Sequence, residues 1–271
     1  MSGKAITLVC VRHGQADHNV EGNEKLFKYT QDDSPVLDTH LTELGRKEVI
    51  LVGKRLAAEA FDLSISSDLE RARDTAQAIA TQNESIDTVE EWKIVRKRFL
   101  GIFEGKIPDL CRAQIIVEDA IEDRDLLTWR IPNGESVVDL KHRIEDFLSH
   151  LIKEARRITS PDPRILVVSH GLFLKELHHV LSSYGTAGPM FGKGNIFHAN
   201  TAVSEYRISY DEEKDDIEHV DCLVYASGEH LAGPQRKENR KASFLLYNHC
   251  NLEEKEAKMK RKITCPFYVA T

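Results

Sequence analysis

The hydrophobic residues of this chain fall into short apolar runs that alternate with amphipathic stretches. The run from Ile6 to Val11 is rich in β-branched residues, which is typical of a strand buried on both faces of a parallel sheet. Phe61 to Ser66 and Arg164 to Ser169 predict two more strands, and late strands are expected at 201–208 and 219–226. The chain therefore supplies the strands of one sheet.

The stretches between these runs carry apolar residues at helical spacing. Thr42 is the expected N-cap of the first helix, and its apolar stripe consists of Val49, Val52, Leu56, Ala57 and Ala60. A second helix is expected within 67–80, Ser136 and Asp139 form a capping box that opens a third, and a fourth follows Ser169. Alternating strands and helices predict the α/β class, as a three-layer sandwich with a mostly parallel central sheet and helices on both faces.

Two stretches interrupt this alternation. Residues 15–39 and 89–132 lack a clear period, and both are too long for ordinary connections. We expect the first to cover a site and the second to form a lid-like insertion with short helices. Such loops select the substrate, and no sequence rule identifies the substrate from them.

Composition narrows the class of protein. Of 271 residues, 41% are hydrophobic and 30% are charged, so the chain can fill a core and stay soluble. The net charge of −7 gives no support for nucleic-acid binding, and no run approaches the roughly 18 apolar residues of a membrane helix. The five cysteines are scattered without a CxxC pair, and the N-terminus lacks the apolar core of a signal peptide. We therefore expect a reducing compartment, the cytoplasm or the nucleus.

The C-terminal part differs in charge from the rest. Residues 233–271 contain nine Lys and Arg against four Asp and Glu, a net +5, which leaves −12 for the body. We expect a catalytic domain at 1–232, followed by a basic tail that is partly disordered or a surface helix. A docking or membrane-surface role for the tail is the alternative.

Candidate chemistry gathers at the strand ends. Arg12 and His13, then Arg71, then His170 each stand where a predicted strand ends, and open α/β sheets bind ligands at that edge. A single histidine there is more often structural. Two guanidiniums and two imidazoles, however, would repel one another without an anion between them. Because the planar fork of arginine grips phosphate oxygens at two points, the sequence predicts a phosphoryl site.

These residues stand in a recognisable order of motifs: Arg12-His13-Gly14, Ser66-Ser67-Asp68-Leu69-Glu70-Arg71-Ala72, Gly134-Glu135-Ser136 and Ser169-His170-Gly171. From about Ile6 to Leu231 the chain resembles the histidine phosphatase superfamily, the phosphoglycerate mutase-like enzymes, in its phosphatase-type branch. The resemblance implies that His13 attacks the phosphorus of a small phosphorylated substrate and becomes phosphohistidine, which water then hydrolyses. It also implies that Arg12, Arg71 and His170 stabilise the phosphoryl charge, without a metal or other cofactor.

Two polar residues after His13 are further candidates for contacts to the phosphoryl group or the substrate. Asn19 matches a family position that contacts the phosphoryl group, and Gln15 is close enough in sequence to help. The alternative is that both side chains make only local loop hydrogen bonds.

One position departs from the family pattern. The family usually has its proton-donating glutamate where this chain has Lys97, and Glu104 is the nearest carboxylate in sequence. An ammonium with an unperturbed pKa near 10.4 is a poor acid at neutral pH unless burial lowers that pKa. Lys97 and Glu104 are therefore both candidate proton donors. We expect slow turnover or a preference for good leaving groups.

Three rival functions stay open. A phosphoglycerate mutase-type phosphotransferase is the first, although the segment after His13 lacks the tryptophan and Phe-Thr-Gly-Trp run of the mutases. The second is a catalytically weakened protein that binds a phosphorylated ligand, as Lys97 would allow. The third is a metallohydrolase using His13 and His170, disfavoured because few carboxylates accompany these histidines. The substrate and the oligomeric state stay undetermined.

Overall fold

The structure, a computed structural model, describes residues 4–20, 28–32, 36–105, 128–185, 198–211 and 216–231. Within these ranges one sheet has six strands in the order β5-β4-β6-β1-β7-β8. Its strands are β1 (Lys4–Arg12), β4 (Leu63–Ser66), β5 (Glu90–Glu91), β6 (Arg164–Ser169), β7 (Val203–Tyr210) and β8 (Ile217–Ser227). A separate hairpin is formed by β2 (Lys28–Tyr29) and β3 (Leu37–Asp38).

The central strand β1 pairs in parallel with β6 on one side and antiparallel with β7 on the other. The pairs β4–β6 and β4–β5 are also parallel, whereas β7–β8 is antiparallel. The expected mostly parallel sheet is therefore confirmed, with an antiparallel edge. Because β1, β4 and β6 run the same way, their carboxyl ends lie at one edge of the sheet.

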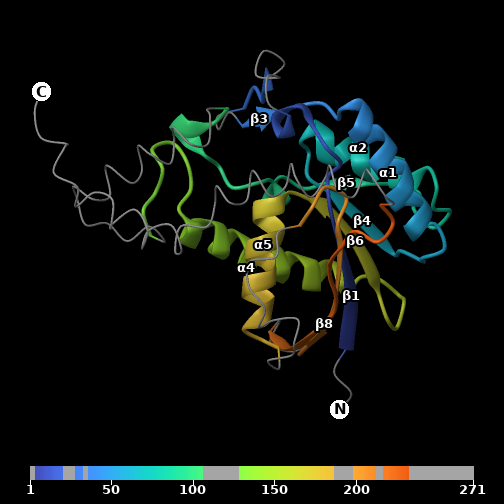
Figure 1. Ribbon diagram of the computed structural model, residues 1–271. Coiled ribbons are helices and arrows are strands. Elements are labelled where there is room, and N and C mark those ends of the chain that lie inside the picture. The colour runs from blue at the N-terminus through green and yellow to red at the C-terminus, as the bar shows by residue number, and fades with distance from the viewer. Residues whose placement is uncertain are drawn as a thin grey trace, which may run out of the picture.

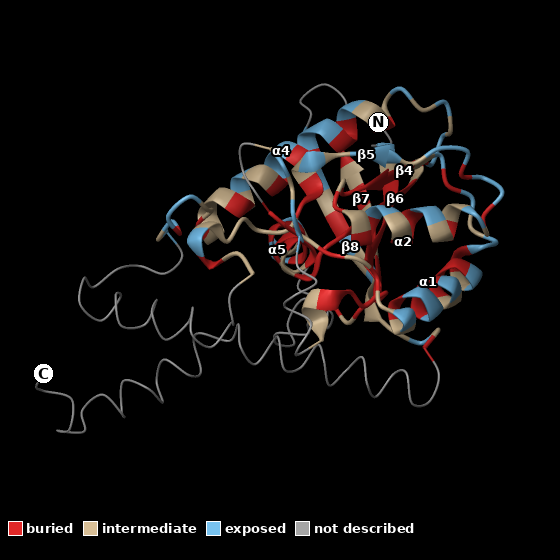
Figure 2. Ribbon diagram, turned by 90° about the horizontal axis from the view of Figure 1, so that it is seen from above, coloured by how far each residue is buried: buried red, intermediate tan, exposed pale blue. Residues whose placement is uncertain are grey.

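Helices cover both faces of this sheet (Figure 1). The longer helices are α1 (Glu43–Leu56), α2 (Glu70–Ala80), α4 (Val137–Ala155) and α5 (Gly171–Ser182), and the short 3₁₀ turns are η1 (Asp17–Asn19), η3 (Lys93–Val95) and η4 (Gly101–Phe103). Ile6 and Leu8 of β1 pack into the core beneath α4 and α5, whereas Val9 and Val11 pack beneath α1 and α2. Figure 2 shows buried residues on the sheet and on the helix faces turned to it. The predicted three-layer α/β sandwich is confirmed.

Local signals set several boundaries as expected. The Thr42 hydroxyl accepts a hydrogen bond from the Gly45 amide, and the capping box of Ser136 and Asp139 opens α4. The expected helical stripe through Ala57 and Ala60 is wrong, because α1 ends at Leu56 and both alanines are exposed. The Asn83 amide donates to the carbonyls of Leu56 (2.6 Å) and Glu59 (2.8 Å), which satisfies the helix end and lets the chain turn into β4.

The two irregular stretches hold more regular structure than the sequence indicated. The first forms the β2–β3 hairpin, and the second begins with β5. The hydrophobic pattern does not predict this strand, because its residues, Glu90 and Glu91, are both acidic. Charged residues are a common feature of edge strands, which conceals them from hydrophobic patterns. The short helices expected there are η3 and η4, while 106–127 and the tail 233–271 lie outside the described residues. The division into a domain and a tail therefore stays a prediction.

Within the described ranges, none of the helices combines the length and apolar character needed to cross a membrane.

The capping box makes a stability prediction. Ser136→Ala removes the hydroxyl that accepts from the Asp139 amide at 3.0 Å and should lower the free energy of unfolding by about 1 kcal/mol in urea titrations. Ser149→Ala, at an exposed position of the same helix, is the matched control and should change stability by less than about 0.5 kcal/mol. Equal losses in both variants would contradict the proposed role of the cap.

Candidate active site

His13 lies directly after β1 and is almost completely buried, with 2% of its surface exposed. Its Nδ1 lies 2.7 Å from the carbonyl oxygen of Gly14. A carbonyl oxygen can only accept, so Nδ1 carries the proton and the lone pair resides on Nε2. The backbone thus fixes the tautomer that a nucleophilic imidazole needs.

Close packing holds this turn in place. A Cβ at Gly14 would lie 2.8 Å from the Val49 side chain and 2.9 Å from the Gly45 carbonyl, so only glycine fits without displacing α1. The Gly14 amide donates to Thr75 Oγ1 at 3.0 Å, which ties the turn to α2 as well. Two helices therefore fix the position of the His13 ring.

His170 comes from the end of the neighbouring strand β6, at the N-cap position of α5. Its ring centroid lies 5.2 Å from that of His13. Both ring nitrogens are buried, and neither has a hydrogen-bond partner among the described residues. Burying such a group without a partner costs free energy that a ligand oxygen can offset.

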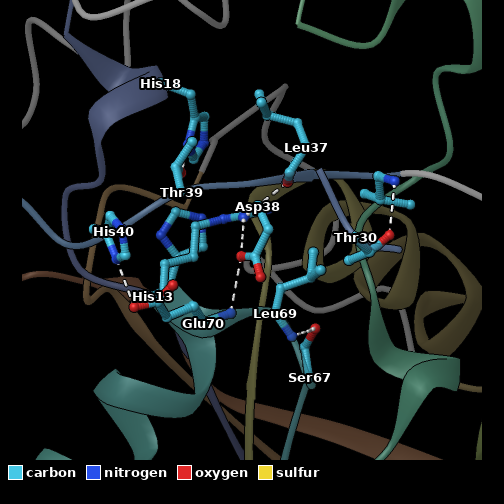
Figure 3. A network of polar contacts seen from close by, with 12 residues as sticks. His13, His18, Thr30, Leu37, Asp38, Thr39, His40, Ser67, Leu69 and Glu70 are labelled. Atoms are coloured by element: carbon cyan, nitrogen blue, oxygen red, sulfur yellow. Dashed lines mark hydrogen bonds and ion pairs between the residues drawn. The ribbon is translucent and has the colours of Figure 1, made fainter. Parts of the chain in front are cut away.

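Arg71 lies in the first turn of α2 and is 1% exposed. Its two contacts on the hairpin strand β3, Leu37 and Asp38, are labelled in Figure 3. Its Nη1 donates to the Leu37 carbonyl at 3.1 Å and lies 3.5 Å from Asp38 Oδ1. Its Nε is buried and has no partner within the described part of the chain. The hairpin strand β3 therefore orients this guanidinium from one side and leaves donor capacity for an anion.

Arg12 is the last residue of β1 rather than the first residue after it, and it is 3% exposed. Its Nη1 donates to the His198 carbonyl at 2.8 Å. Burial lowers the pKa of Arg12 to about 9, with the Glu48 carboxylate opposing that shift, and burial lowers the pKa of Arg71 to about 10. Both guanidiniums therefore remain charged at pH 7.

The charges of the imidazoles follow first from burial and then from the nearby arginines. Burial lowers the pKa of His13 well below 6.5, and the nearby Arg71 and Arg12 lower it further. The pKa of His170 is lowered in the same way, first by burial and then by Arg71. The site at pH 7 thus consists of neutral imidazoles among fixed cations, which suits a nucleophile facing an anionic substrate.

The structure adds His18, which was not among the residues predicted from the sequence. Its ring lies 5.6 Å from that of His13, and its Nδ1 lies 2.7 Å from Thr39 Oγ1. The pKa of this half-buried imidazole is also lowered well below 6.5, by burial and then by Arg71. The one feature of the sequence that could have indicated His18 as a site residue is its position between His13 and Asn19.

Asn19 and Gln15 both follow His13 closely in the chain but make different contacts. Asn19 Oδ1 accepts from the Ala16 amide at 3.0 Å, while its buried Nδ2 has no partner among the residues described here. Gln15 Oε1 accepts from Thr42 Oγ1 at 2.7 Å, and the backbone N–H of Gln15 donates to Glu48 Oε2 at 2.8 Å. Asn19 therefore retains a donor for a ligand, whereas the contacts of Gln15 tie it to the start of α1.

Lys97 and Glu104 form a largely buried ion pair, with side-chain exposures of 14% and 6%. Glu104 Oε1 also accepts from the Leu37 amide at 2.8 Å, and Oε2 accepts from the Leu100 amide at 3.2 Å. Burial lowers the pKa of Lys97, the adjacent Glu104 raises it, and Arg71 lowers it. The Lys97 charge in turn contributes to the lowered pKa of His170, so its ammonium acts on the same site.

The described ranges contain no group of three or more His, Cys, Asp or Glu arranged to hold a metal ion. The described part of the chain therefore gives no support to the third alternative, a metallohydrolase.

An α/β sandwich with an imidazole and two arginines at the carboxyl ends of its parallel strands defines a class of protein suited to phosphoryl groups. The chain belongs to the histidine phosphatase superfamily (branch 1), whose family model matches residues 8–222. The resemblance seen in the sequence motifs is thereby confirmed.

Individual relatives include both phosphatases and mutases. The glucosyl-3-phosphoglycerate phosphatase of Mycobacterium tuberculosis (strain ATCC 25618 / H37Rv) is 30% identical over 200 residues, 71% of this chain and 83% of the relative. The 2,3-bisphosphoglycerate-dependent phosphoglycerate mutase of Bartonella bacilliformis is 34% identical over 178 residues, 65% of this chain and 81% of the relative. A metal-independent phosphoserine phosphatase of Arabidopsis thaliana is 26% identical over 202 residues, 70% of this chain and 75% of the relative.

Solved structures agree on the fold. The native mycobacterial glucosyl-3-phosphoglycerate phosphatase superposes with a TM-score of 0.62 at 25% identity, covering 83% of this chain and 100% of the other. The phosphoglycerate mutase of Bacillus anthracis str. Sterne gives a TM-score of 0.62 at 21% identity, covering 84% and 96%. The expected phosphoglycerate mutase-like fold is confirmed. The relatives named as phosphatases support the prediction of a histidine phosphatase.

The protonation state of His13 is directly measurable. We expect ¹⁵N NMR of the imidazoles in the ligand-free protein to show His13 neutral and protonated on Nδ1 from pH 8 to pH 6.5, because its pKa is well below 6.5. Arg71→Gln removes a cation that lowers this pKa, so His13 should then protonate at higher pH. Titration of wild-type His13 at or above pH 6.5 would contradict the description of the site.

Proposed function

We propose that the protein hydrolyses small phosphate monoesters in two steps through a phosphohistidine on His13. In the first step a bond forms between His13 Nε2 and phosphorus as the ester P–O bond breaks and the leaving oxygen takes a proton. In the second step water gives a proton back to the group that protonated the leaving oxygen and attacks phosphorus, the P–N bond breaks, and inorganic phosphate leaves. Splitting the displacement in this way lowers each barrier.

One observation carries the proposal: the side chains of His13, Arg12 and Arg71 are buried together at the strand ends, where burial and the two arginines lower the pKa of His13. The guanidiniums, with His170, would stabilise charge on the equatorial phosphoryl oxygens, and the Nδ2 of Asn19 would add a donor. Gln15 would support the site through its contacts with α1. Fixed cations supply the electrostatic stabilisation that a metal provides elsewhere, so the proposed reaction requires no metal.

For the proton donor we favour Lys97 over Glu104. Glu104 accepts hydrogen bonds from Lys97 Nζ and from the amides of Leu37 and Leu100, so both of its oxygens act as acceptors. Lys97 has a proton to give, and burial lowers its pKa towards the useful range. The ammonium would protonate the leaving oxygen, and Glu104 would hold the amine in place afterwards.

A phosphotransferase of the mutase type is the second candidate, because the relatives include mutases that are 34% identical. The mutase segment after His13 is absent from this sequence, which favours hydrolysis. A weakened protein that only binds phosphorylated ligands is the third. We also propose that the enzyme works in a reducing compartment, the cytoplasm or nucleus, where Cys10 and Cys222 would remain thiols as in the structure.

The overall proposal predicts hydrolysis of p-nitrophenyl phosphate in the presence of a chelator, because its charge stabilisation comes from arginines. His13→Asn should reduce kcat to background while the protein still binds inorganic phosphate. Activity that disappears with chelator would support a metallohydrolase. Phosphate binding without turnover in the wild type would support a binding protein, and exchange between 2- and 3-phosphoglycerate would support a mutase.

We expect the Lys97→Met variant to lose activity by a factor that depends on the leaving group of the substrate. Loss of a general acid costs about 10²–10⁴-fold, so kcat on an alkyl phosphate should fall by that factor, with a small change on p-nitrophenyl phosphate. Lys47→Met, which breaks the exposed pair with Glu43, is the matched control and should change neither rate. Equal losses on the two substrates would contradict acid catalysis by Lys97.

Glu104→Gln separates the two candidate donors. If Lys97 is the acid, activity falls as pH rises through its pKa. Because Glu104 raises that pKa, the variant should lose activity at a lower pH than the wild type. If Glu104 is the acid, the variant should instead lose alkyl phosphatase activity at every pH.

A further inference from the structure

Arg143, on the second turn of α4, uses all five of its N–H donors inside the protein. Two of them pair with the carboxylate of Glu135, from Nε to Oε1 at 2.8 Å and from Nη2 to Oε2 at 2.9 Å. The other three donate to backbone carbonyls: Nη1 to Ile94 (2.7 Å) and Arg96 (2.9 Å), and Nη2 to Lys97 (3.1 Å). No donor of this guanidinium is left for a substrate.

Glu135 contacts the same segment from its other side. Its Oε2 accepts from the Phe99 amide at 2.9 Å. Its carbonyl oxygen accepts from the Arg98 guanidinium at 2.9 and 3.0 Å. The ion pair therefore bonds to the chain immediately before and after Lys97, and we call these two residues, Arg143 and Glu135, the clamp.

The clamp is rigid as well as saturated. The side chains of Arg143 and Glu135 are 14% and 12% exposed, so water contributes little to their hydrogen bonding. The Arg143 guanidinium lies 5.0 Å from the Phe99 ring and 5.7 Å from the Phe173 ring of α5. Aromatic faces on a guanidinium whose donors are all bonded leave it little freedom to move.

We propose that Arg143, through its pair with Glu135, is a positioning residue that sets where the Lys97 ammonium meets the leaving group. This inference rests on the proposed role of Lys97. The lysine side chain has four rotatable bonds, so two anchors are needed to place its nitrogen. Glu104 holds the ammonium end, and Arg143 holds the backbone end.

The expected size of the effect follows from geometry. A misplacement of about 1 Å in a reacting group can cost 10²-fold in rate. Arg143 does not contact His13, Arg12 or Arg71 through any of its donors, so loss of the clamp should leave phosphate binding intact. Only the step in which the leaving oxygen takes a proton should become slower.

Arg143→Lys is the test, because lysine keeps the charge opposite Glu135 but cannot reproduce the planar fork of five donors. We expect kcat on an alkyl phosphate to fall about 10- to 100-fold, while kcat on p-nitrophenyl phosphate and both KM values change less than about twofold. Arg157→Lys, at the exposed pair with Glu154 near the end of α4, is the matched control and should alter neither substrate.

The double variant Lys97→Met/Arg143→Lys adds a second readout. If Arg143 acts through Lys97, the double variant should be no slower on the alkyl phosphate than Lys97→Met alone. Additive losses, or an equal loss on both substrates in Arg143→Lys, would overturn the inference. If Arg143→Lys fails to fold, Glu135→Gln provides the same comparison, since it breaks the clamp from the other partner.

The outcomes separate this inference from the proposed function. A Lys97→Met variant with full alkyl phosphatase activity would refute the role of Lys97 and the clamp with it. A slow Lys97→Met variant beside an unaffected Arg143→Lys variant would refute the clamp alone.

Discussion

The site depends on one electrostatic arrangement: His13 is buried beside two arginines that stay charged. Burial and the two cations both disfavour the imidazolium, so His13 presents a neutral Nε2 at physiological pH. Asp38 and Glu48 offset part of the cost of burying Arg71 and Arg12, and an anionic phosphoryl group would offset more of it. The proposed nucleophile and the proposed stabilisation of phosphoryl charge thus have a single physical cause, the burial of imidazoles and guanidiniums together at the edge of the sheet.

The sheet and its covering loops serve that arrangement. Parallel β1 and β6 deliver His13 and His170 side by side, and the hairpin strand β3 orients Arg71 through the Leu37 carbonyl. The Leu37 amide bonds to Glu104, which in turn holds Lys97. One residue of the hairpin therefore connects the guanidinium that would grip the phosphate to the ammonium that would serve the leaving group. Loops and strands together, rather than strands alone, complete the site.

The parts of this arrangement that have strong local signals could be predicted from the sequence. The buried run of β1, the capping residues and the histidines at strand ends follow from periodicity and side-chain chemistry. Features that depend on a tertiary contact could not be predicted in this way. Asn83 ends α1 before Ala57, and β5 is a strand through pairing with β4 rather than through its own pattern. His18 and Arg143 stand in ordinary loop and helix sequences, and only the folded chain brings them to the site or to the segment that carries Lys97.

The central claim is that His13 itself receives the phosphoryl group. The most direct measurement is rapid acid-free quenching of the enzyme during turnover of p-nitrophenyl phosphate, followed by mass spectrometry that locates the added phosphate. The account predicts a phosphorylated peptide with the modification on His13, formed within the first turnover and lost as water hydrolyses it. An unmodified His13 under turnover, or phosphate on another residue, would contradict the account.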